Sequence, residues 1–580
     1  MARPGATNAD VARLFLEAAE LLELAGENPF RVRAYQQAAR TIEELDEPVA
    51  RVAARGAKAL DSLPGIGEDL AEKIRQIVAT GTFPLIGQLR KRTPKGLPGL
   101  LKVPGLGPKR ARVLYDRLGI RSVAGLARAA RAGKVRGLPG FGAKTESAIL
   151  AAVGGGVAAG ETRMLRARAA SYAEPLVQRL RAVKGVERVE VAGSFRRGRE
   201  TVGDLDLLVT GRARAAVVEA FTSAPGVARV LARGTTRAAV RLGSGLQVDL
   251  RVLAPESFGA GLYYFTGSKA HNVALRGIAR AGGLKINEYG VFRGKTRVAG
   301  RTEEEVLAAV GLPWIPPELR EDRGEIAAAR AGRLPELVTL RDLRGDLQCH
   351  TTDSDGRDEL EAMARAAEAL GHEYLAVTDH SPSVRVTGGM DAAGFRAQRR
   401  RIDRLNAKLG KLTVLAGAEV DILGDGRLDL DDATLAGLDV VVISIHSRFN
   451  LPEAEQTRRV LRALAHPAAD ILGHPTGRII GRRAGIALDL EAVARAAAEH
   501  GVMLEVNAQP ERLDLDDLAA RAAVERGARL VIGSDAHATA ELGFLRWGVD
   551  QARRGWVERK DVANALPLAR LLKLLHGGRR

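Results

Sequence analysis

Cysteine is almost absent from this sequence of 580 residues, in which Cys349 is the only one. No intrachain disulfide can form, so the small secreted folds held together by disulfides are excluded and a reducing compartment is favoured. No apolar run approaches the roughly 20 residues that cross a bilayer. The first residues, MARPGATNADVARLF, also lack the apolar core of a signal peptide. These absences predict a cytoplasmic protein that has no membrane partner.

The first 340 residues contain little histidine and few acidic residues. His271 is the only one of the ten histidines in this part. Residues 341–580 hold 34 Lys and Arg and 36 Asp and Glu, so the first 340 residues hold the remaining 54 basic and 34 acidic side chains, a net charge of +20. Such an excess is typical of a surface that meets a phosphate backbone, and a solvated basic surface without a partner is the alternative. We expect phosphate binding before residue 340 and metal chemistry after it.

The hydrophobic pattern changes along the chain, whose length predicts several domains. Residues 9–80 show helical spacing, which predicts short amphipathic helices. Residues 186–253 contain strand-like runs such as DLDLLVT and LQVDLRVL. The proline-rich segment GLPWIPPELRED (311–322) predicts a junction between domains. From residue 345 on, short apolar strands alternate with Ala-rich helical stretches, the pattern of a parallel β/α barrel.

A short glycine motif occurs three times before a helical stretch, as LPGIG (63–67), VPGLG (103–107) and LPGFG (138–142). The glycines permit a tight turn, and the helix that follows points free N–H groups and its positive dipole end at a phosphate. The repeat predicts helix-hairpin-helix elements that bind the DNA backbone, and three ordinary Pro-Gly loops are the alternative. The predicted DNA-binding residues are Gly65, Gly67, Gly105, Gly107, Lys109, Gly140, Gly142 and Lys144.

Three aspartates on predicted strands form a first candidate active site. Asp204 and Asp206 are two residues apart, so their side chains point to one face of a strand, and Asp249 lies on another strand. Carboxylates that converge repel one another unless cations lie between them. Two Mg²⁺ ions, for which Mn²⁺ can substitute, would activate a primer 3′-oxygen and hold a triphosphate. A D-x-D pair alone is more often a solvated strand edge, so the surrounding segments carry the argument.

Those segments resemble a known family. A GS turn with Arg197 precedes the aspartates and is suited to holding phosphates, and YYFTGSKAHNVALRGIARAGGLKINEYGVF (263–292) follows them. Over residues 9–316 the combination resembles the family X DNA polymerases, including DNA polymerase beta. The resemblance implies that Asp204, Asp206 and Asp249 are metal ligands. The nucleotide-binding residues that it implies are Gly193, Ser194, Arg197, Tyr264, Phe265, Gly267, Asn272 and Arg276.

Some positions depart from the family pattern or leave alternatives open. Gln247 stands where animal members carry Arg near the primer terminus, and Lys269 replaces an acidic residue near the incoming base. Lys73 aligns with the catalytic lysine of the family's lyase domain, which attacks an abasic sugar after losing its proton. Binding of a 5′-phosphate by Lys73 is the alternative role. Asp69 stands where a phosphate-binding lysine often lies.

Eight potential metal ligands follow predicted strands in the C-terminal part. The C-terminal strand ends of a parallel barrel converge on one rim, so these side chains should meet there. Mixed imidazole and carboxylate ligation suits Zn²⁺, Mn²⁺ or Fe²⁺. Four other histidines, His372, His466, His500 and His576, are expected to be ordinary surface or core residues. The predicted ligands are His350, Asp355, His380, Glu419, His446, His474, Asp535 and His537.

The motifs DLQCHTTDSDG, AVTDH, AGAEVD, ISIH, LGHP and GSDAH resemble the PHP (polymerase and histidinol phosphatase) domain over about residues 343–575. The resemblance implies a distorted (β/α)7 barrel, up to three Mn²⁺ or Zn²⁺ ions and phosphoester hydrolysis, which in family X polymerases is associated with 3′→5′ exonuclease activity. The family begins H-x-H, but Gln348 takes the first position here, and its amide oxygen is a poorer ligand than imidazole. Asn507 and Arg512 lie where the family often has polar residues that face the substrate.

The sequence therefore predicts a multidomain α+β protein with helical N-terminal domains, a palm of the DNA polymerase beta type and a C-terminal PHP barrel. We expect a monomeric, nucleoid-associated DNA-directed DNA polymerase that fills short gaps in base excision repair. Its PHP domain is expected to cleave 3′ ends, and its partners to be gapped or nicked DNA and dNTPs. The predicted parts are a lyase-like domain (1–82), a hairpin subdomain (83–155), the palm (156–255), a nucleotide-binding subdomain (256–317), a linker (318–342) and the PHP domain (343–580).

Three alternatives remain at this point. The PHP domain could be structural and catalytically silent, which the Gln348 substitution favours. The chain could bind DNA ends without turnover, against which the three aspartates argue. It could also be a small-molecule phosphatase, against which the DNA-binding hairpins argue.

Overall fold

The chain folds into two compact units, which divide between Thr162 and Arg163. Each is considered by itself. This computed structural model describes residues 8–25, 27–43, 45, 48–63, 65–92, 100, 106, 108–142, 145, 146, 149, 163–384 and 387–575. Over these residues, no helix combines the length and the apolar character that a bilayer crossing requires.

Among its described residues, the first unit contains helices and connecting turns and no strand. Apolar residues at helical spacing, such as Val11, Phe15 and Leu22, are buried against the neighbouring helices. Phe15 also lies edge-on to Tyr35 and Phe83, with ring centroids 5.4 and 5.8 Å away. The helices are α1 (Asn8–Leu24), α2 (Pro29–Glu43), α3 (Val49–Ala54), α4 (Ala57–Asp61), α5 (Glu68–Thr80), α6 (Pro84–Arg92), α8 (Pro108–Leu118) and α9 (Val123–Arg131).

The second unit begins with a five-stranded sheet in the order β2-β4-β7-β6-β5, in which only the β4–β7 pair is parallel. A short pair, β1 with β3, lies beside it. The elements of this region are β1 (Met164–Leu165), α11 (Arg166–Arg181), β2 (Val186–Val191), α12 (Gly193–Arg196), β3 (Thr201–Val202), β4 (Asp204–Gly211), α13 (Arg214–Thr222), β5 (Val227–Arg233), β6 (Arg237–Leu242) and β7 (Gln247–Leu253).

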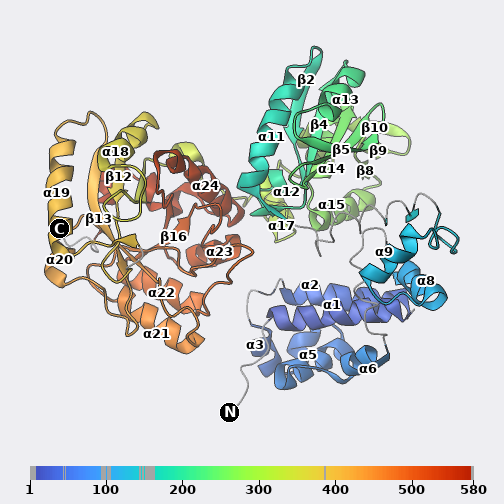
Figure 1. The fold of residues 1–580 in the computed structure, drawn as a ribbon, viewed down its shortest axis with the longest axis horizontal. Helices are drawn as coiled ribbons and strands as arrows, with labels where there is room; N and C mark the ends of the chain where they lie inside the picture. The colour runs from blue at the N-terminus through green and yellow to red at the C-terminus, as the bar shows by residue number, and fades with distance from the viewer. Residues whose placement is uncertain are drawn as a thin grey trace. The chain divides into compact units, whose positions relative to one another are not determined.

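The two faces of this sheet differ because side chains alternate along each strand. On β4, Leu205, Leu207 and Val209 belong to the core that also contains the apolar residues of α11 and α13. Leu208 belongs instead to a separate cluster with Phe258 of the next helix. Asp204 and Asp206 share the face of Leu208, so the alternation places them opposite the large core. Figure 1 shows α11 and α13 beside the strands.

A smaller subdomain follows, built around the antiparallel sheet β10-β9-β8. Its core contains Tyr263, Leu275, Ile286 and Ile315. The elements are α14 (Phe258–Thr266), α15 (Lys269–Ala281), β8 (Lys285–Asn287), β9 (Gly290–Arg293), β10 (Thr296–Ala299), α16 (Glu303–Ala308) and α17 (Glu325–Arg330).

The segment predicted as a linker, residues 318–342, is packed rather than extended. Arg320 is fully buried and its Nη1 lies 2.6 Å from Glu303 Oε1. Glu325 is also fully buried, with Oε1 2.5 Å from His271 Nδ1. Buried polar and charged groups need a fixed partner, so the Arg320–Glu303 ion pair and the Glu325–His271 hydrogen bond attach the segment to the preceding subdomain.

The C-terminal region is a barrel of seven parallel strands in chain order, β11 to β17. A parallel bridge between Cys349 and Ala536 joins the two ends of the sheet. In Figure 1 helices such as α19, α21 and α22 lie outside the strands. The elements are β11 (Gly345–Cys349), α18 (Leu360–Ala369), β12 (Tyr374–Val377), α19 (Ala392–Asn406), β13 (Thr413–Asp421), α20 (Asp432–Ala436), β14 (Val440–Ser444), α21 (Glu453–Leu464), β15 (Ile471–Leu472), α22 (Leu490–His500), β16 (Met503–Asn507), α23 (Asp517–Glu525), β17 (Leu530–Gly533), α24 (Leu545–Arg554) and α25 (Leu568–Leu571).

Candidate functional site

The three predicted aspartates lie on adjacent strands of the five-stranded sheet. Asp206 on β4 is the register partner of Asp249 on the parallel strand β7, and Asp204 is paired with Gln247. Gln247 Nε2 donates a hydrogen bond of 2.8 Å to Asp249 Oδ2. Burial, followed by the charges of Asp204 and Asp249, raises the pKa of Asp206 to about 7. The crowding of these carboxylates fits a site for divalent cations, which would remove the repulsion.

The turn from β2 into α12 passes directly over Asp206. Gly193 has a φ of 66°, and a Cβ at this position would lie only 2.9 Å from Asp206 Oδ2. The site therefore excludes a larger residue both by backbone conformation and by space. Ser194 follows in the same turn, so the turn and the carboxylates form one surface.

The other predicted nucleotide-binding residues come from the turn after α12 and from α14 and α15. Arg197 Nη1 donates a hydrogen bond of 2.5 Å to the Thr266 carbonyl, and a Cβ at Gly267 would lie 3.2 Å from the same nitrogen. Asn272 Nδ2 donates to the Tyr264 carbonyl at 2.8 Å. The ring of Phe265 lies edge-on to that of Tyr264, 5.3 Å away. Arg276 is exposed, one turn after Asn272 on α15.

Two of the three predicted hairpins lie largely within the described residues. Gly65 and Gly140 both have left-handed backbone, with φ of 77° and 80°. Gly67 precedes α5, whose first turn carries Glu68 and Asp69. Acidic residues at that end weaken its attraction for a phosphate. Gly142, the second glycine of the third hairpin, also lies within the described residues.

Other hairpin predictions cannot be placed in the same way. Gly105, Gly107 and Lys144 lie outside the described residues. Lys109 lies in the first turn of α8, but its side chain is not described.

Lys73, the predicted lyase residue, is engaged by an acidic neighbour one helical turn away. Its ammonium group forms an ion pair with Asp69 and donates a hydrogen bond of 3.2 Å to the Asp69 carbonyl. The side chain is 13% exposed, against 80% for Asp69. Any nucleophilic role of Lys73 would require this ion pair to break.

The eight predicted ligands of the barrel come together on the rim formed by the strand ends. His350 follows β11, and its Nε2 lies 3.1 Å from Asp535 Oδ1, after β17, and 3.3 Å from Glu419 Oε2 on β13. Glu419 Oε1 is 3.2 Å from His446 Nε2 and 2.9 Å from His474 Nε2. Three overlapping groups each bring their ligand atoms within 4.8 Å of one another. The groups are His350, Asp355, His380 and His537; His380, Glu419 and His446; and His350, Glu419 and Asp535.

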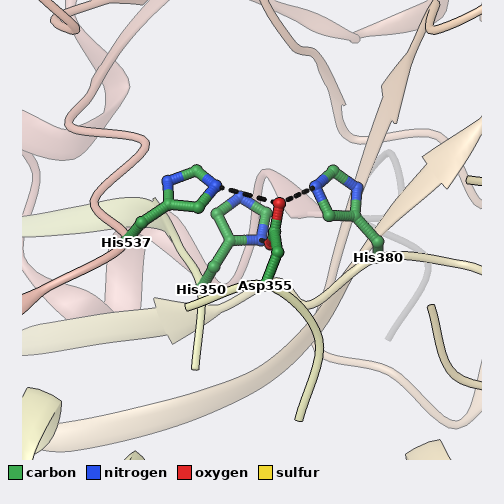
Figure 2. Close-up of side chains that lie close together, drawn as sticks. All are labelled: His350, Asp355, His380 and His537. Atoms are coloured by element: carbon green, nitrogen blue, oxygen red, sulfur yellow. Dashed lines mark ion pairs between the residues drawn. The ribbon is translucent and has the colours of Figure 1, made fainter. Parts of the chain in front are cut away.

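Asp355 lies at the centre of the group drawn in Figure 2. The carboxylate points between His380 and His537, whose Nε2 atoms are 3.6 and 3.4 Å from Asp355 Oδ2. The rings of His380 and His537 lie on either side of His350, with centroids 4.6 and 4.4 Å away. Imidazole and carboxylate groups in such density fit the binding of transition-metal ions.

Opposite charges compensate one another in this cluster. Burial would favour neutral side chains, but the hydrogen bonds that the His446 ring donates to Asp421 and Glu419 raise the pKa of His446 to about 9. Burial also acts on Glu419, yet the surrounding imidazoles, His380 first among them, hold its pKa well below the ordinary value. Burial lowers the pKa of His380 to about 4, which leaves a neutral ring with a lone pair for a metal.

Gln348 occupies the position at which an H-x-H motif would have its first histidine. Its Nε2 donates a hydrogen bond of 3.0 Å to Glu419 Oε2. Its Oε1 is buried and has no hydrogen-bond partner among the described residues. An acceptor left in this state is costly, so the oxygen fits a weak ligand position that faces the cluster.

A cavity of about 370 Å³ opens beside the cluster. Arg512 Nε lies 3.8 Å from Asp535 Oδ2, and Arg357 forms an ion pair with Glu541. The spacing of the metal motifs gave no sign of Arg357 or Glu541, because they lie just outside those motifs. The lining residues are Asp355, Arg357, Ile479, Gln509, Glu511, Arg512, Asp535, His537 and Glu541.

One buried acid that supports the ligands, Asp379, was not predicted from the sequence. Asp379 accepts hydrogen bonds from the Thr351 amide at 2.8 Å, the Ser354 hydroxyl at 2.5 Å and Gln398 Nε2 at 2.6 Å. It thereby fixes the loop between His350 and Asp355. The motif AVTDH contained this aspartate, but nothing in the spacing separated a supporting acid from a ligand.

Models of five known domain families match successive stretches of the chain. A helix-hairpin-helix domain matches residues 6–83, and a SAM-like helix-hairpin-helix tandem matches residues 98–154. The DNA polymerase beta palm matches residues 163–237, and the DNA polymerase beta thumb matches residues 261–321. The PHP domain matches residues 346–509. With the seven-stranded barrel, these matches confirm the predicted fold class.

Similarity to known proteins extends over nearly the whole chain. The "DNA polymerase/3′-5′ exonuclease PolX" of Bacillus subtilis (strain 168) is 39% identical over 563 residues, which cover 96% of this chain and 97% of that protein. A probable phosphatase of Thermoanaerobacter sp. (strain X514) is 30% identical over 38% of this chain and 89% of its own length. One of Acetivibrio thermocellus is 30% identical over 34% of this chain and 81% of its own length.

Proposed function

Since the chain belongs to the PolX family of DNA polymerases that carry a PHP domain, we propose that it fills short gaps in DNA and trims 3′ ends with two separate active sites. The polymerase reaction joins a dNTP to a primer and releases pyrophosphate. The PHP reaction hydrolyses a phosphodiester at the 3′ end. The observation that carries the proposal is the presence of two metal-type clusters of different chemistry in one chain.

The polymerase proposal rests on the aspartate triad. Asp204, Asp206 and Asp249 are the residues that would hold two Mg²⁺ ions, for which Mn²⁺ can substitute. Such ions, when bound, lower the pKa of the primer 3′-hydroxyl and neutralise the triphosphate. Asp249 is held in place by Gln247 through a hydrogen bond of 2.8 Å, so the protein itself orients this carboxylate for the primer side.

Nucleotide binding is assigned to the surface around the triad. Backbone N–H groups at Gly193 and the hydroxyl of Ser194 would bind phosphate oxygens, and Arg197 would oppose the charge that develops during transfer. Tyr264, Phe265 and Gly267 would lie along the sugar. Asn272 would contact the base edge, because its buried Oδ1 lacks a hydrogen-bond partner among the described residues. Arg276 would face the template strand.

The helical first unit is proposed to bind the DNA backbone. Residues 1–162 contain 25 Lys and Arg and 16 Asp and Glu, a net charge of +9, and this charge and the family models of two hairpin regions support this role. A cavity of about 560 Å³ at the junction of α8 and α9 is lined by three cationic side chains, Arg121, Arg128 and Lys134, which could bind phosphates. Catalysis by Lys73 stays a prediction, because its amine is engaged by Asp69.

The PHP proposal rests on the histidine-rich cluster and its cavity. The eight ligand residues would hold up to three Mn²⁺ or Zn²⁺ ions, which supply an acidified water for attack on phosphorus. Arg357 and Arg512 line the cavity and would bind a phosphate. The close approach of these imidazole and carboxylate groups, within 4.8 Å of one another in three groups, supports this use.

A denaturing gel of a 5′-labelled primer on one-nucleotide-gapped DNA tests both activities. Reactions contain Mn²⁺, with and without dNTPs, and compare the wild type with Asp249→Ala and His350→Ala. We expect Asp249→Ala to lose extension by at least about a thousandfold and keep shortening, and His350→Ala to do the reverse, because each removes a ligand from one site. A wild type that fails to extend would contradict the polymerase proposal and favour DNA-end binding.

A second candidate is a polymerase whose PHP domain is structural. Gln348 favours it, because an amide oxygen replaces an imidazole at one ligand position. In the same gel, extension without any shortening by any protein would support this candidate. We also propose that the protein acts in base excision repair, as a monomer that associates with the nucleoid.

A further inference from the structure

Helix α24 of the barrel region contacts the five-stranded sheet region through one face. Arg554 lies four residues after Asp550 and three after Gln551, so each of the two lies next to Arg554 on this side of the helix. Asp550 Oδ2 accepts a bond of 2.5 Å from Arg166, and Gln551 Nε2 donates one of 3.0 Å to Glu200. The turn that carries the predicted phosphate-binding residues is therefore backed by the PHP domain.

Arg554 contacts this turn directly. Its Nη1 donates to the Arg197 carbonyl at 2.8 Å and to Glu321 Oε1 at 2.9 Å, and its Nη2 donates to Asp517 Oδ2 at 2.6 Å. Its side chain is 2% exposed. A buried guanidinium with three acceptors is held in one position, so it can fix the groups that it touches.

Glu321 connects Arg554 to the side chain of Arg197. The same Oε1 atom that accepts from Arg554 also accepts from Arg197 Nε at 3.0 Å. The Thr266 carbonyl holds Arg197 Nη1. Nε and Nη1 are therefore engaged, and among the described residues no hydrogen bond involves Nη2. The guanidinium is therefore held at two nitrogens, and Nη2 is the nitrogen left for a phosphate.

The charges around Glu321 do not balance. Four guanidinium groups share two carboxylates within this interface, which leaves an excess of positive charge. Burial, followed by the charge of Arg554, lowers the pKa of Arg199, so the cluster favours an added anion. The members are Arg197, Arg199, Arg323, Arg554, Glu321 and Asp517.

We propose that Glu321, fixed by Arg554 of the PHP domain, is a positioning residue of the polymerase site that holds the Arg197 guanidinium ready for the triphosphate. The PHP domain thus contributes to nucleotide binding without touching the nucleotide. The inference rests on the proposed role of Arg197 in triphosphate binding. It adds a residue pair that lies outside the aspartate triad and outside the GS turn.

Single-nucleotide insertion by the full-length protein on gapped DNA tests this proposal. We expect Glu321→Gln to raise the KM for dNTP about tenfold while kcat changes less than about threefold, because an unoriented arginine weakens binding more than chemistry. Arg554→Gln should behave similarly, and Arg554→Lys should recover only part of the loss, because an ammonium cannot bridge as a guanidinium does.

The matched control uses the neighbouring ion pair of the same two elements. Glu318 Oε1 accepts from Arg553 Nε at 2.8 Å, one residue before Arg554 on α24. Glu318→Gln removes the same charge from the same segment but does not reach Arg197. Its KM for dNTP should stay within about twofold of the wild type. Equal KM shifts in Glu318→Gln and Glu321→Gln would indicate a general structural role and overturn the proposal.

A double variant and a binding measurement complete the test. In an Arg197→Ala background, Glu321→Gln should add no further rise in KM, since the two changes act through one contact. An additional tenfold rise, or a lowered KM in Glu321→Gln alone, would overturn the proposal. The affinity for dNTP is also measured on DNA with a dideoxy-terminated primer, which permits binding but not extension. This comparison of the wild type with Glu321→Gln tests the inference even if the wild type does not extend primers. Failure of wild-type extension contradicts the proposed function, whereas unchanged nucleotide affinity in Glu321→Gln contradicts the inference.

Discussion

The two candidate metal sites of this chain are built in opposite ways. The polymerase site has three carboxylates on adjacent strands, and Asp204 is exposed. The PHP site gathers imidazoles and carboxylates from strand ends around the whole barrel, and His350 and Glu419 are buried. A ligand set drawn from two strands is open on one side, so a substrate must complete it. A set drawn from a closed barrel is nearly complete by itself.

The two sites also differ in the signs of the charges that they bring together. In the polymerase site like charges crowd together, and after burial they raise the pKa of Asp206 to about 7. In the PHP site opposite charges meet, and the hydrogen bonds that His446 donates to Asp421 and Glu419 outweigh burial and raise the pKa of His446 to about 9. The first site therefore gains from any cation, whereas the second gains only from one that replaces its protons. Because the barrel brings more ligand groups together, including imidazoles, we expect a transition-metal ion to bind more tightly there than in the palm.

The largest expected effect comes from removing the carboxylate shared by the barrel ligands. Glu419→Gln should reduce 3′-end shortening by at least about a thousandfold and lower the bound metal, because Glu419 contacts His350, His446 and His474. Elemental analysis and the primer gel measure the two quantities, and primer extension should be unchanged. Glu453→Gln, which makes the same charge change at an exposed position of α21, is the control. Unaltered metal content in Glu419→Gln would break the comparison.

A smaller effect is expected from pH at the polymerase site. The folded pKa of Asp206, about 7, lies above its usual 3.8, so the native state binds more protons than the unfolded state between these values. Without divalent ions, the free energy of unfolding should therefore fall as pH rises from about 4 to about 7. Mg²⁺ competes with the proton, and its affinity should drop about tenfold for each pH unit below 7.

Melting temperatures with and without Mg²⁺ across this pH range measure that effect. Asp206→Asn should remove the loss of stability with rising pH, since an amide does not ionise. Asp403→Asn, at an exposed aspartate of α19 that pairs with Arg399, should keep it. A wild type whose metal-free stability rises from pH 4 to pH 7 in step with that of Asp206→Asn would show that the two sites do not differ as described.

Periodicity explains why so much of both sites could be predicted. The two-residue spacing of Asp204 and Asp206 fixed their common face, and the strand-end positions of the barrel ligands fixed their convergence. Lys73 and Asp69 are four residues apart on α5, so their ion pair was also readable from helical spacing. These inferences depend on regular elements, whose geometry repeats along the chain.

The residues that were missed are positioned by tertiary packing. Glu321 lies 124 residues from Arg197 in sequence, and the two meet only because the segment 318–342 packs against the GS turn. Asp379 lies next to His380, yet it supports the loop before it rather than binding in the cluster. No local pattern distinguishes a buried supporting acid from a ligand. The hairpin around Gly105 and Gly107 lies outside the described residues, so its prediction stays open.

The smallest effect is expected at Gln348, where an amide takes the place of an imidazole in the ligand set of the barrel. Its buried Oε1 has no hydrogen-bond partner among the described residues, and its Nε2 is engaged by Glu419. Gln348→His should place an imidazole at that position, raise the bound metal by up to one ion for each chain and increase shortening about threefold. Gln348→Ala, which removes the Glu419 contact without adding a ligand, is the matched control. Unchanged metal content in Gln348→His, together with a loss in Gln348→Ala, would mean that the amide oxygen already serves as a ligand. The barrel would then be as complete as its closed geometry suggests.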